Sequence, residues 1–446
     1  MIEAATRYLL LPLHERLRGR ETIAHYRRLR RTEQLSAEAL EARREAKLQA
    51  LVDHCLEQVP FYRERLREAG VRAGADVTLA NLNRLPALER SDIQEDPDYL
   101  CAENYAGHLI RYSTGGSTGH PLVFYTDRRK EARHNAHKLR YRAWFGVHPG
   151  DRQVDFWGSP IEWDRQTRLR WAKDRWLLNQ RLLSAFELTP ERLDVYIREL
   201  RAFQPRLIYG YPTVIYRVAA RMHERGSWPR VWRPRLVACT AEMLLEQQRR
   251  TIERAFGCSV ANEYGSRDAG LIAHECPAGS MHLAAEHVVA EVDEPREDGV
   301  GDLLVTNLDG YGMPLLRYRV GDRAALADGV CECGRPLPRM APPTGRSNDF
   351  LVGGHGKAVH SLAPIYVLRE ISKVAQFRVR QRTDHSLEVQ LVVREALSGS
   401  DLEDIRARLK RVLDEDVAID FRFPEVIAPE RSGKYRWVVS DVWEAS

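Results

Sequence analysis

The sequence predicts an α/β fold, with a large N-terminal domain followed by a small α+β C-terminal domain. At 446 residues the chain is longer than one ordinary hydrophobic core requires. Between about residues 130 and 275, short apolar segments alternate with helical patterns, which is typical of a largely parallel sheet covered by helices on both faces. After residue 346, the expected elements follow in βαββαβ order, which indicates a small ferredoxin-like lid.

The large domain is expected to begin with helices. Ser36–Val59 predicts one helix, which Ser36 caps and Pro60 ends. The expected buried strands are Val154–Trp157, Leu207–Tyr209, Leu236–Cys239 and Val260–Tyr264. Between them, Thr189-Pro190 predicts a capped helix start and Glu246–Phe256 predicts another helix.

A strand-rich subdomain is expected from about residue 283 to 346. Its strands are predicted at Val288–Val292, Leu303–Thr306 and Leu315–Tyr318. In the C-terminal domain the expected elements are Phe350–Val352, the helix Ala363–Val374, Phe377–Gln381, Leu387–Val393, the helix Asp401–Leu413 and Ala418–Phe423.

Composition is that of a soluble globular protein, with 43% hydrophobic and 29% charged residues. Seven cysteines and no evident export signal favour a reducing, cytoplasmic setting. The segment Arg7–Arg31 is basic and amphipathic; a solvated surface helix is favoured over contact with a membrane or a partner. A net charge of +5 with mixed-sign clusters does not indicate nucleic-acid binding.

The segment Tyr112–Asp127 reads YSTGGSTGHPLVFYTD. Its glycines allow tight turns close to a ligand, and its hydroxyls and backbone N–H groups suit a polyphosphate. It lacks the Gly-Lys-Ser/Thr of a Walker A loop, and His120 stands where a lysine is expected. A plain Gly/Ser/Thr-rich connector is the alternative.

Four further segments carry side chains suited to a nucleotide or its reaction. Tyr264 offers a flat ring and Asp268 a carboxylate for Mg²⁺, just after the last buried strand of the large domain. Asp322 suits the hydroxyls of a ribose, and Arg346 suits ribose or phosphate. Lys434 can neutralise charge developing on a reacting carboxylate and phosphate. Each segment taken alone is equally a turn or a solvated surface loop.

In order and spacing, this set resembles the core motifs of the adenylate-forming superfamily of acyl- and aryl-CoA synthetases, luciferases and peptide-synthetase adenylation domains. The motifs are the glycine-rich loop, Tyr264-Gly-x-x-Asp268, Tyr318-x-x-Gly-Asp322, Gly345-Arg346-x-x-Asp349 and Ser432-Gly-Lys434. Within the superfamily the chain is similar to the phenylacetate–CoA ligase family, particularly its capsule and natural-product branch. That similarity runs over nearly the whole length, including Gln58–Tyr62, Leu85–Leu88 and Thr240–Glu242.

The resemblance implies an adenylate-forming fold with domains at 1–346 and 349–446 and a hinge at Asn348. It implies that Lys434 drives adenylation and that Asp268 takes the Mg²⁺-linked carboxylate position. The implied ATP-binding residues are Ser113, Thr114, Gly115, Gly116, Ser117, Thr118, Gly119, Glu242, Glu263, Tyr264, Gly265, Ser266, Asp322 and Arg346. His120 in place of lysine, Asp268 in place of glutamate and Asn348 in place of aspartate depart from the usual pattern.

The acyl pocket is expected to involve Trp157, Tyr209, Gly210 and Tyr211, which favours an aryl acid, although the same aromatics suit a core. Cys276, His282, Cys331 and Cys333 have ligand types that suit a structural Zn²⁺. Such positions recur in the resembled family; four unlinked reduced residues are the alternative.

The expected reaction is activation of a small-molecule carboxylic acid by ATP and Mg²⁺, followed by thioester formation with coenzyme A. Two alternatives stay open. One is an adenylating enzyme that transfers the acyl group to an amine, a hydroxyl or a carrier protein. The other is a catalytically idle nucleotide-binding protein. A monomer or a homodimer is expected.

Overall fold

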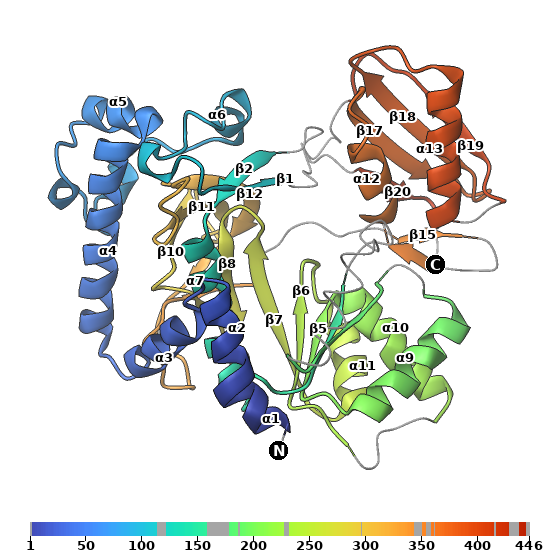
Figure 1. The fold of residues 1–446 in the computed structure, drawn as a ribbon, viewed down its shortest axis with the longest axis horizontal. Helices are drawn as coiled ribbons and strands as arrows, with labels where there is room; N and C mark the ends of the chain where they lie inside the picture. Colours follow the sequence, from blue (N-terminus) through green and yellow to red (C-terminus); the bar gives the residue numbers. More distant parts are fainter. Residues whose placement is uncertain are drawn as a thin grey trace.

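The computed structural model describes residues 2–113, 122–157, 178–185, 188–226, 232–295, 297–342, 350–353, 358–360, 362–413, 416–427 and 437–442. Figure 1 shows a large N-terminal part and a separate C-terminal sheet domain. The predicted α/β class is confirmed.

N-terminal helices pack along one side of the large part (Figure 1). They are α1 Ile2–Ala5, η1 Thr6–Leu10, α2 Leu11–Leu17, α3 Thr22–Thr32, α4 Ala37–Gln58, α5 Pro60–Glu68 and α6 Arg90–Glu95. The predicted cap of α4 is confirmed, since the Ser36 side chain accepts a hydrogen bond from the Ala39 N–H at 3.2 Å. Pro60 then begins α5, where its fixed φ is favourable.

A nine-stranded mixed sheet forms the centre, in the order β13-β14-β9-β8-β7-β6-β5-β3-β4. Its members are β3 Gln153–Phe156, β4 Gln180–Leu183, β5 Leu207–Gly210, β6 Leu236–Thr240, β7 Ser259–Ser266, β8 Gly270–Glu275, β9 Met281–Leu283, β13 Leu326–Ala327 and β14 Arg339–Met340. Strands β4, β3, β5, β6 and β7 are parallel, but every pairing from β7 to β13 is antiparallel. The largely parallel sheet predicted between about residues 130 and 275 is therefore confirmed, with β8 as the antiparallel exception. Only Arg267, Asp268 and Ala269 separate β7 from β8, and such a short link forms a hairpin rather than a crossover.

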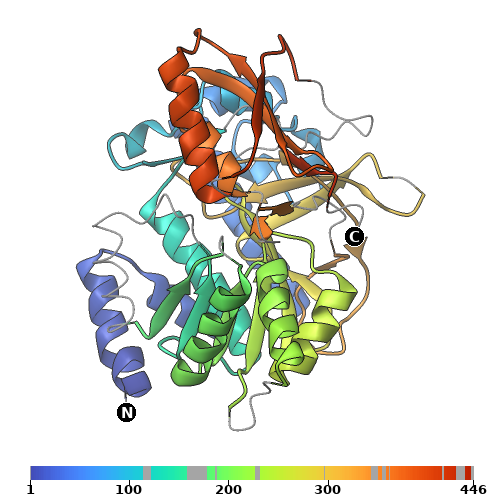
Figure 2. The same cartoon turned by 90° about the vertical axis from the view of Figure 1, so that its right-hand side faces the viewer.

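Helices flank this sheet. The helices α9 Pro190–Phe203, α10 Pro212–Glu224 and α11 Glu246–Phe256 pack side by side, in front of the sheet in Figure 2. Thr189 caps α9 through its side chain, as predicted, by accepting from the Arg192 N–H at 3.2 Å. Helix α7 (Arg128–Ala143) packs against β8 and α3.

Two smaller sheets complete the large part. Strands β1 Ile110–Ser113 and β2 Val123–Thr126 pair with each other, and β10 Val288–Asp293, β11 Gly301–Asn307 and β12 Tyr318–Ala324 form a three-stranded sheet. The strand predicted at Leu315–Tyr318 is wrong, because β12 begins only at Tyr318. Arg317 has φ of +49°, which interrupts an extended chain, and its Nε donates to Glu291 at 3.1 Å.

The C-terminal domain has a four-stranded sheet in the order β19-β18-β17-β20, with two helices. Its elements are β15 Phe350–Val352, β16 Ala358–His360, α12 Leu362–Arg369, β17 Val374–Gln381, β18 Leu387–Val393, α13 Gly399–Val412, β19 Ile419–Arg422 and β20 Val438–Ser440. The predicted helix Ala363–Val374 is too long: α12 ends at Arg369, and Val374 begins β17. β15 does not join the four-stranded sheet but pairs with β16, and β20 takes the position beside β17.

Candidate active site

The candidate site lies at the carboxyl edge of the parallel strands. Strands β5, β6 and β7 are in register, with Gly210 beside Cys239 and Thr240 beside Glu263. The segments Gly210-Tyr211, Ala241-Glu242 and Arg267-Asp268 therefore leave the sheet at one edge, where ligands of open α/β sheets bind (Figure 1).

Asp268 is held rigidly in the link between β7 and β8. One carboxylate oxygen accepts from the Tyr318 hydroxyl at 2.8 Å, and the other accepts from the Ala269 N–H at 2.9 Å and from the Ser266 hydroxyl. The buried Lys130 ammonium donates to the Asp268 backbone carbonyl at 2.7 Å. Burial and the adjacent carboxylate raise the pKa of Tyr318, so its hydroxyl stays a donor. The carboxylate of Asp268 is thus preorganised. Carboxylate oxygens are a type of ligand that suits Mg²⁺.

Tyr264 and Asp322, two residues predicted to bind the nucleotide, meet directly. The Tyr264 hydroxyl donates to an Asp322 carboxylate oxygen at 3.0 Å, although 58 residues separate them in sequence. The contact joins the central sheet to the three-stranded sheet, because Tyr264 lies in β7 and Asp322 in β12. The two side chains therefore meet in the fold, and their binding of one nucleotide stays a prediction.

Gly265 is required by the fold itself. A Cβ at this position would lie 2.3 Å from the Gly270 carbonyl oxygen across the β7–β8 hairpin. The register of the two strands also shifts between Tyr264 and Gly265. Only glycine lets the hairpin close here, which explains this residue without reference to a ligand.

Tyr209 lies in a buried network that also contains Glu263. Its hydroxyl donates to Glu263 Oε1 at 2.8 Å, and the Lys138 ammonium lies 3.0 Å from the same oxygen. Burial by itself would raise the pKa of Glu263, but Lys138 and Arg142 outweigh it and lower the pKa to about 2. Glu263 therefore stays ionised near neutral pH and fixes Tyr209, a positioning contact that the sequence analysis did not predict.

The predicted acyl-pocket aromatics stack on one another. The Trp157 ring stacks on Tyr211 with centroids 4.5 Å apart, and on Tyr209 at 6.0 Å. Tyr211 is only 2% exposed, so it belongs to the core, whereas Trp157 and Tyr209 are half-buried. Gly210 permits close packing of β3 and β5, because a Cβ there would lie 2.4 Å from the Phe156 carbonyl oxygen.

Glu242 follows a strained residue at the end of β6. Ala241 has φ of +69°, a conformation that costs free energy for a residue with a Cβ and that is common at functional sites. The Glu242 carboxylate accepts from both the backbone N–H and the hydroxyl of Thr213. The strain turns Glu242 toward the start of α10.

Several predicted site residues lie outside the described part of the chain. They are Thr114, Gly115, Gly116, Ser117, Thr118, Gly119, His120, Arg346, Asn348 and Lys434. Ser113 is described only as the last residue of β1. The phosphate loop, the hinge and the catalytic lysine therefore remain predictions.

The predicted zinc ligands come together. Sγ of Cys276, Cys331 and Cys333 and a ring nitrogen of His282 all lie within 4.8 Å of one another. Cys276 Sγ and Cys331 Sγ are 3.7 Å apart, near the roughly 3.8 Å edge of a tetrahedron with 2.3 Å Zn–S bonds. The other ring nitrogen of His282 lies 3.1 Å from the Leu337 carbonyl oxygen, which orients the imidazole. The donor set fits a structural Zn²⁺.

This cluster lies at the antiparallel end of the central sheet, not in the three-stranded sheet. Cys276 follows β8, His282 lies in β9 and pairs with Arg339 of β14, and both other cysteines precede β14. The strand-rich subdomain predicted at 283–346 therefore contributes strands to two sheets, the three-stranded sheet and the central sheet.

A second group of potential metal ligands, His25, His137 and Asp309, is better explained as an ion-pair network. One Asp309 oxygen already pairs with Lys47 at 2.6 Å and with Arg133, and the other lies 2.8 Å from His287 Nδ1. Cations around the carboxylate oppose binding of a further cation.

Comparisons with known proteins agree with this fold. Protein CapK of Staphylococcus aureus is 28% identical over 388 residues, which cover 86% of this chain and 85% of CapK. The phenylacetate-coenzyme A ligase of Thermus thermophilus is 29% identical over 334 residues, or 72% and 73% of the two chains. The chain is homologous to CapK and to the phenylacetate-coenzyme A ligases. The CapK C-terminal domain family matches residues 351–441 of this chain.

A solved structure of 2-hydroxyisobutyryl-CoA ligase in complex with 2-HIB-AMP and CoA superposes on this chain with a TM-score of 0.62. The two chains are 20% identical, with 93% of each covered. The predicted adenylate-forming fold is therefore confirmed.

Proposed function

We propose that this protein activates a carboxylic acid with ATP and Mg²⁺ to an acyl-adenylate, and then transfers the acyl group to coenzyme A. The observation that carries this proposal is a pair of hydrogen bonds near the carboxyl edge of the sheet, from Tyr264 to Asp322 and from Tyr318 to Asp268, which join β7 and the link after it to β12. The homologous phenylacetate-coenzyme A ligases support the same chemistry.

In the first step, a carboxylate oxygen of the acid attacks the α-phosphorus of ATP. The new O–P bond gives the acyl-adenylate, while the bond to pyrophosphate breaks. Little covalent chemistry falls to the protein, so positioning and charge stabilisation dominate. Asp268 would hold the Mg²⁺ that neutralises phosphate charge, Tyr264 and Asp322 would position the nucleoside, and Lys434 would stabilise the developing charge.

In the second step, the thiolate of coenzyme A attacks the acyl carbonyl and AMP leaves. We propose that the domain at 349–446 rotates about Asn348, relative to the domain at 1–346, between the two steps. Trp157 and Tyr209 are half-buried aromatic residues near the carboxyl edge, and this aromatic character favours an aryl acid.

The test is a pyrophosphate-release and hydroxamate screen of the purified protein with aryl, fatty and amino acids. We expect at least one aryl acid to stimulate pyrophosphate release, and coenzyme A to consume the adenylate. If amines or hydroxyl compounds consumed the adenylate and coenzyme A did not, the result would favour transfer of the acyl group to one of these alternative acceptors. If the protein bound ATP but no acid stimulated pyrophosphate release, the result would indicate a catalytically idle nucleotide-binding protein.

We further propose a structural Zn²⁺ at Cys276, His282, Cys331 and Cys333. Stoichiometric zinc is expected by elemental analysis, and chelation is expected to lower Tm by about 5 °C or more, because metal binding couples to folding. Cys331→Ser should lose the metal, whereas Cys258→Ser, at a cysteine outside the cluster, should keep it. Zinc-free protein with an unchanged Tm would contradict the proposal.

A further inference from the structure

The N-terminal helical segment exposes several large apolar side chains to solvent. Four large ones are exposed: Tyr8 by 70%, Leu9 by 63%, Leu13 by 50% and Leu17 by 78%. The three leucines are spaced by four residues, so they follow one side of the helix. We call these four residues the leucine face.

The opposite side of this segment is polar and anchored. Thr6 is buried and its hydroxyl accepts from the Asn179 amide at 3.1 Å, while the Arg7 guanidinium lies 2.6 Å from Asp151. The buried Glu15 carboxylate accepts from the Thr22 N–H at 3.0 Å. Leu10 and Leu11 are half-buried beside these polar anchors, whereas Leu9, Leu13 and Leu17 remain exposed, which is unusual for a surface helix. The leucine face is therefore held in a fixed orientation with its apolar surface in contact with solvent.

A basic cavity adjoins the end of α2. Arg18, Arg20 and Arg128 line it together with Leu17, Gly19 and Ile110, and none of these lining residues is acidic. Arg20 lies 3.6 Å from Glu131; no ion pair of Arg18 or Arg128 occurs within the described residues.

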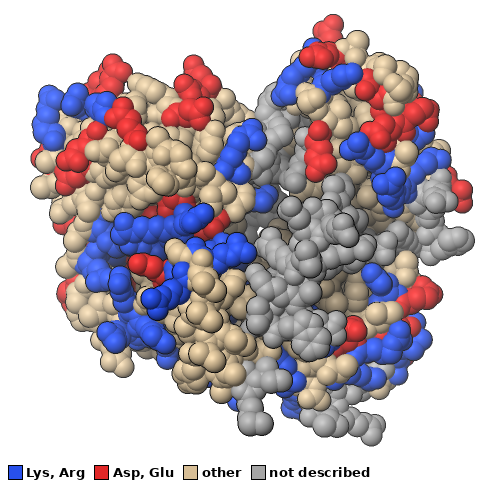
Figure 3. Space-filling model, in the orientation of Figure 1, with Lys and Arg blue, Asp and Glu red and all other residues tan. Residues whose placement is uncertain are grey.

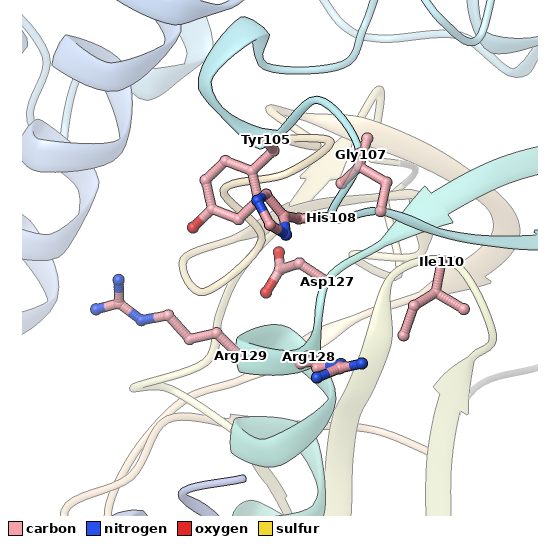
Figure 4. A pocket seen from close by; sticks show the side chains of 8 residues that line it. Tyr105, Gly107, His108, Ile110, Asp127, Arg128 and Arg129 are labelled. Carbon is pink, nitrogen blue, oxygen red and sulfur yellow. The ribbon is translucent and has the colours of Figure 1, made fainter. Parts of the chain in front are cut away.

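Arg128 also borders a neighbouring cavity, where His108 and Arg129 lie near the buried Asp127 (Figure 4). In Figure 3, Lys and Arg gather beside the uncharged surface over α2. Guanidinium groups match the geometry of a phosphate, so the basic cavity suits a phosphate-bearing headgroup.

We propose that the leucine face and the basic cavity together dock this protein on a bilayer surface that contains anionic phospholipid. The side chains of the leucine face would enter the boundary between headgroups and acyl chains, and Arg18 and Arg128 would contact headgroup phosphates. A soluble phosphate ligand would use the cavity but would leave the leucines in water, which is why the bilayer is favoured. Across the part of the chain that the structure covers, no helix has the length and apolarity to cross a bilayer, so the segment lies on the surface.

The test is flotation of the full-length protein with two kinds of vesicle, phosphatidylcholine alone and phosphatidylcholine with one third phosphatidylglycerol. Binding is expected to the anionic vesicles and to weaken with added salt. Leu13→Gln/Leu17→Gln should reduce partitioning at least tenfold, since two leucines lose apolar burial. Arg18→Gln/Arg128→Gln should reduce it by about fivefold for each arginine.

Leu326→Gln/Val426→Gln is the matched control, because it removes two exposed apolar side chains elsewhere, 45% and 72% exposed. It should bind vesicles as the wild type does. Failure of the wild-type protein to float with anionic vesicles at low salt would overturn the proposal. So would equal losses in the control and leucine variants. Sedimentation showing a dimer that Leu13→Gln/Leu17→Gln converts to a monomer would instead assign the leucine face to a second copy of the chain.

Discussion

Replacing Asp268 with asparagine should lower acid-dependent pyrophosphate release by about 10²–10³ without unfolding the protein. The change removes the charge that would hold Mg²⁺ but keeps nearly the same volume, and losing one preorganised electrostatic group commonly costs a factor of this size. The Tyr318 hydroxyl can still donate to the remaining amide oxygen, because its distance to the Asp268 side chain is 2.8 Å. The measurement is the initial rate of pyrophosphate release at saturating ATP and acid, together with Tm.

Tyr318→Phe is the matched variant for this experiment. It removes a hydrogen bond to Asp268 but leaves the carboxylate, so we expect a loss of about tenfold at most. Asp298→Asn, at an exposed turn, should leave the rate unchanged. An Asp268→Asn protein that keeps more than a tenth of wild-type activity would exclude a metal-holding role for this carboxylate.

Lys434→Ala should likewise lose about 10²–10³ in acid-dependent pyrophosphate exchange while ATP still binds. The expected reason is loss of one cation that is close to the reacting groups only as charge develops on them. Removing it should therefore change the exchange rate far more than the ATP dissociation constant.

Lys410→Ala is the control for this prediction, since Lys410 lies in α13 of the same C-terminal domain. It should exchange pyrophosphate as the wild type does. Near-wild-type exchange by Lys434→Ala would defeat the assignment of the catalytic lysine, whereas equal losses in both variants would indicate damage to the C-terminal domain.

Local signals predicted the helix starts and the buried strands. Ser36, Pro60 and Thr189 act through the backbone of their own turn. Their effect on where a helix starts can therefore be predicted without the rest of the chain. Strand β18 was predicted with its observed bounds, Leu387–Val393, because its apolar alternation is strong.

The direction of the strands and the sheet to which each belongs were predicted less well from the sequence. The predicted parallel sheet reverses at β8 because of a short link, and the predicted helix at 363–374 ends early because Val374 joins β17. Partner strands, rather than local propensity, decide such boundaries.

The order of the motifs, through its resemblance to the adenylate-forming superfamily, predicted the fold. The choice of Asp268, Tyr264 and Asp322 also came from the sequence, because each residue type carries its chemistry wherever it lies. Only the tertiary structure decided which groups support them. Tyr318 reaches Asp268, Lys138 reaches Glu263, and the four zinc-ligand candidates meet across up to 57 residues of sequence. The exposure of the leucine face also could not be predicted from the sequence. Helical periodicity shows that one side of a helix is apolar, but not which side packs on the protein. Hydrogen bonds and burial depend on segments distant in the chain, so they exist only once the fold has brought those segments together.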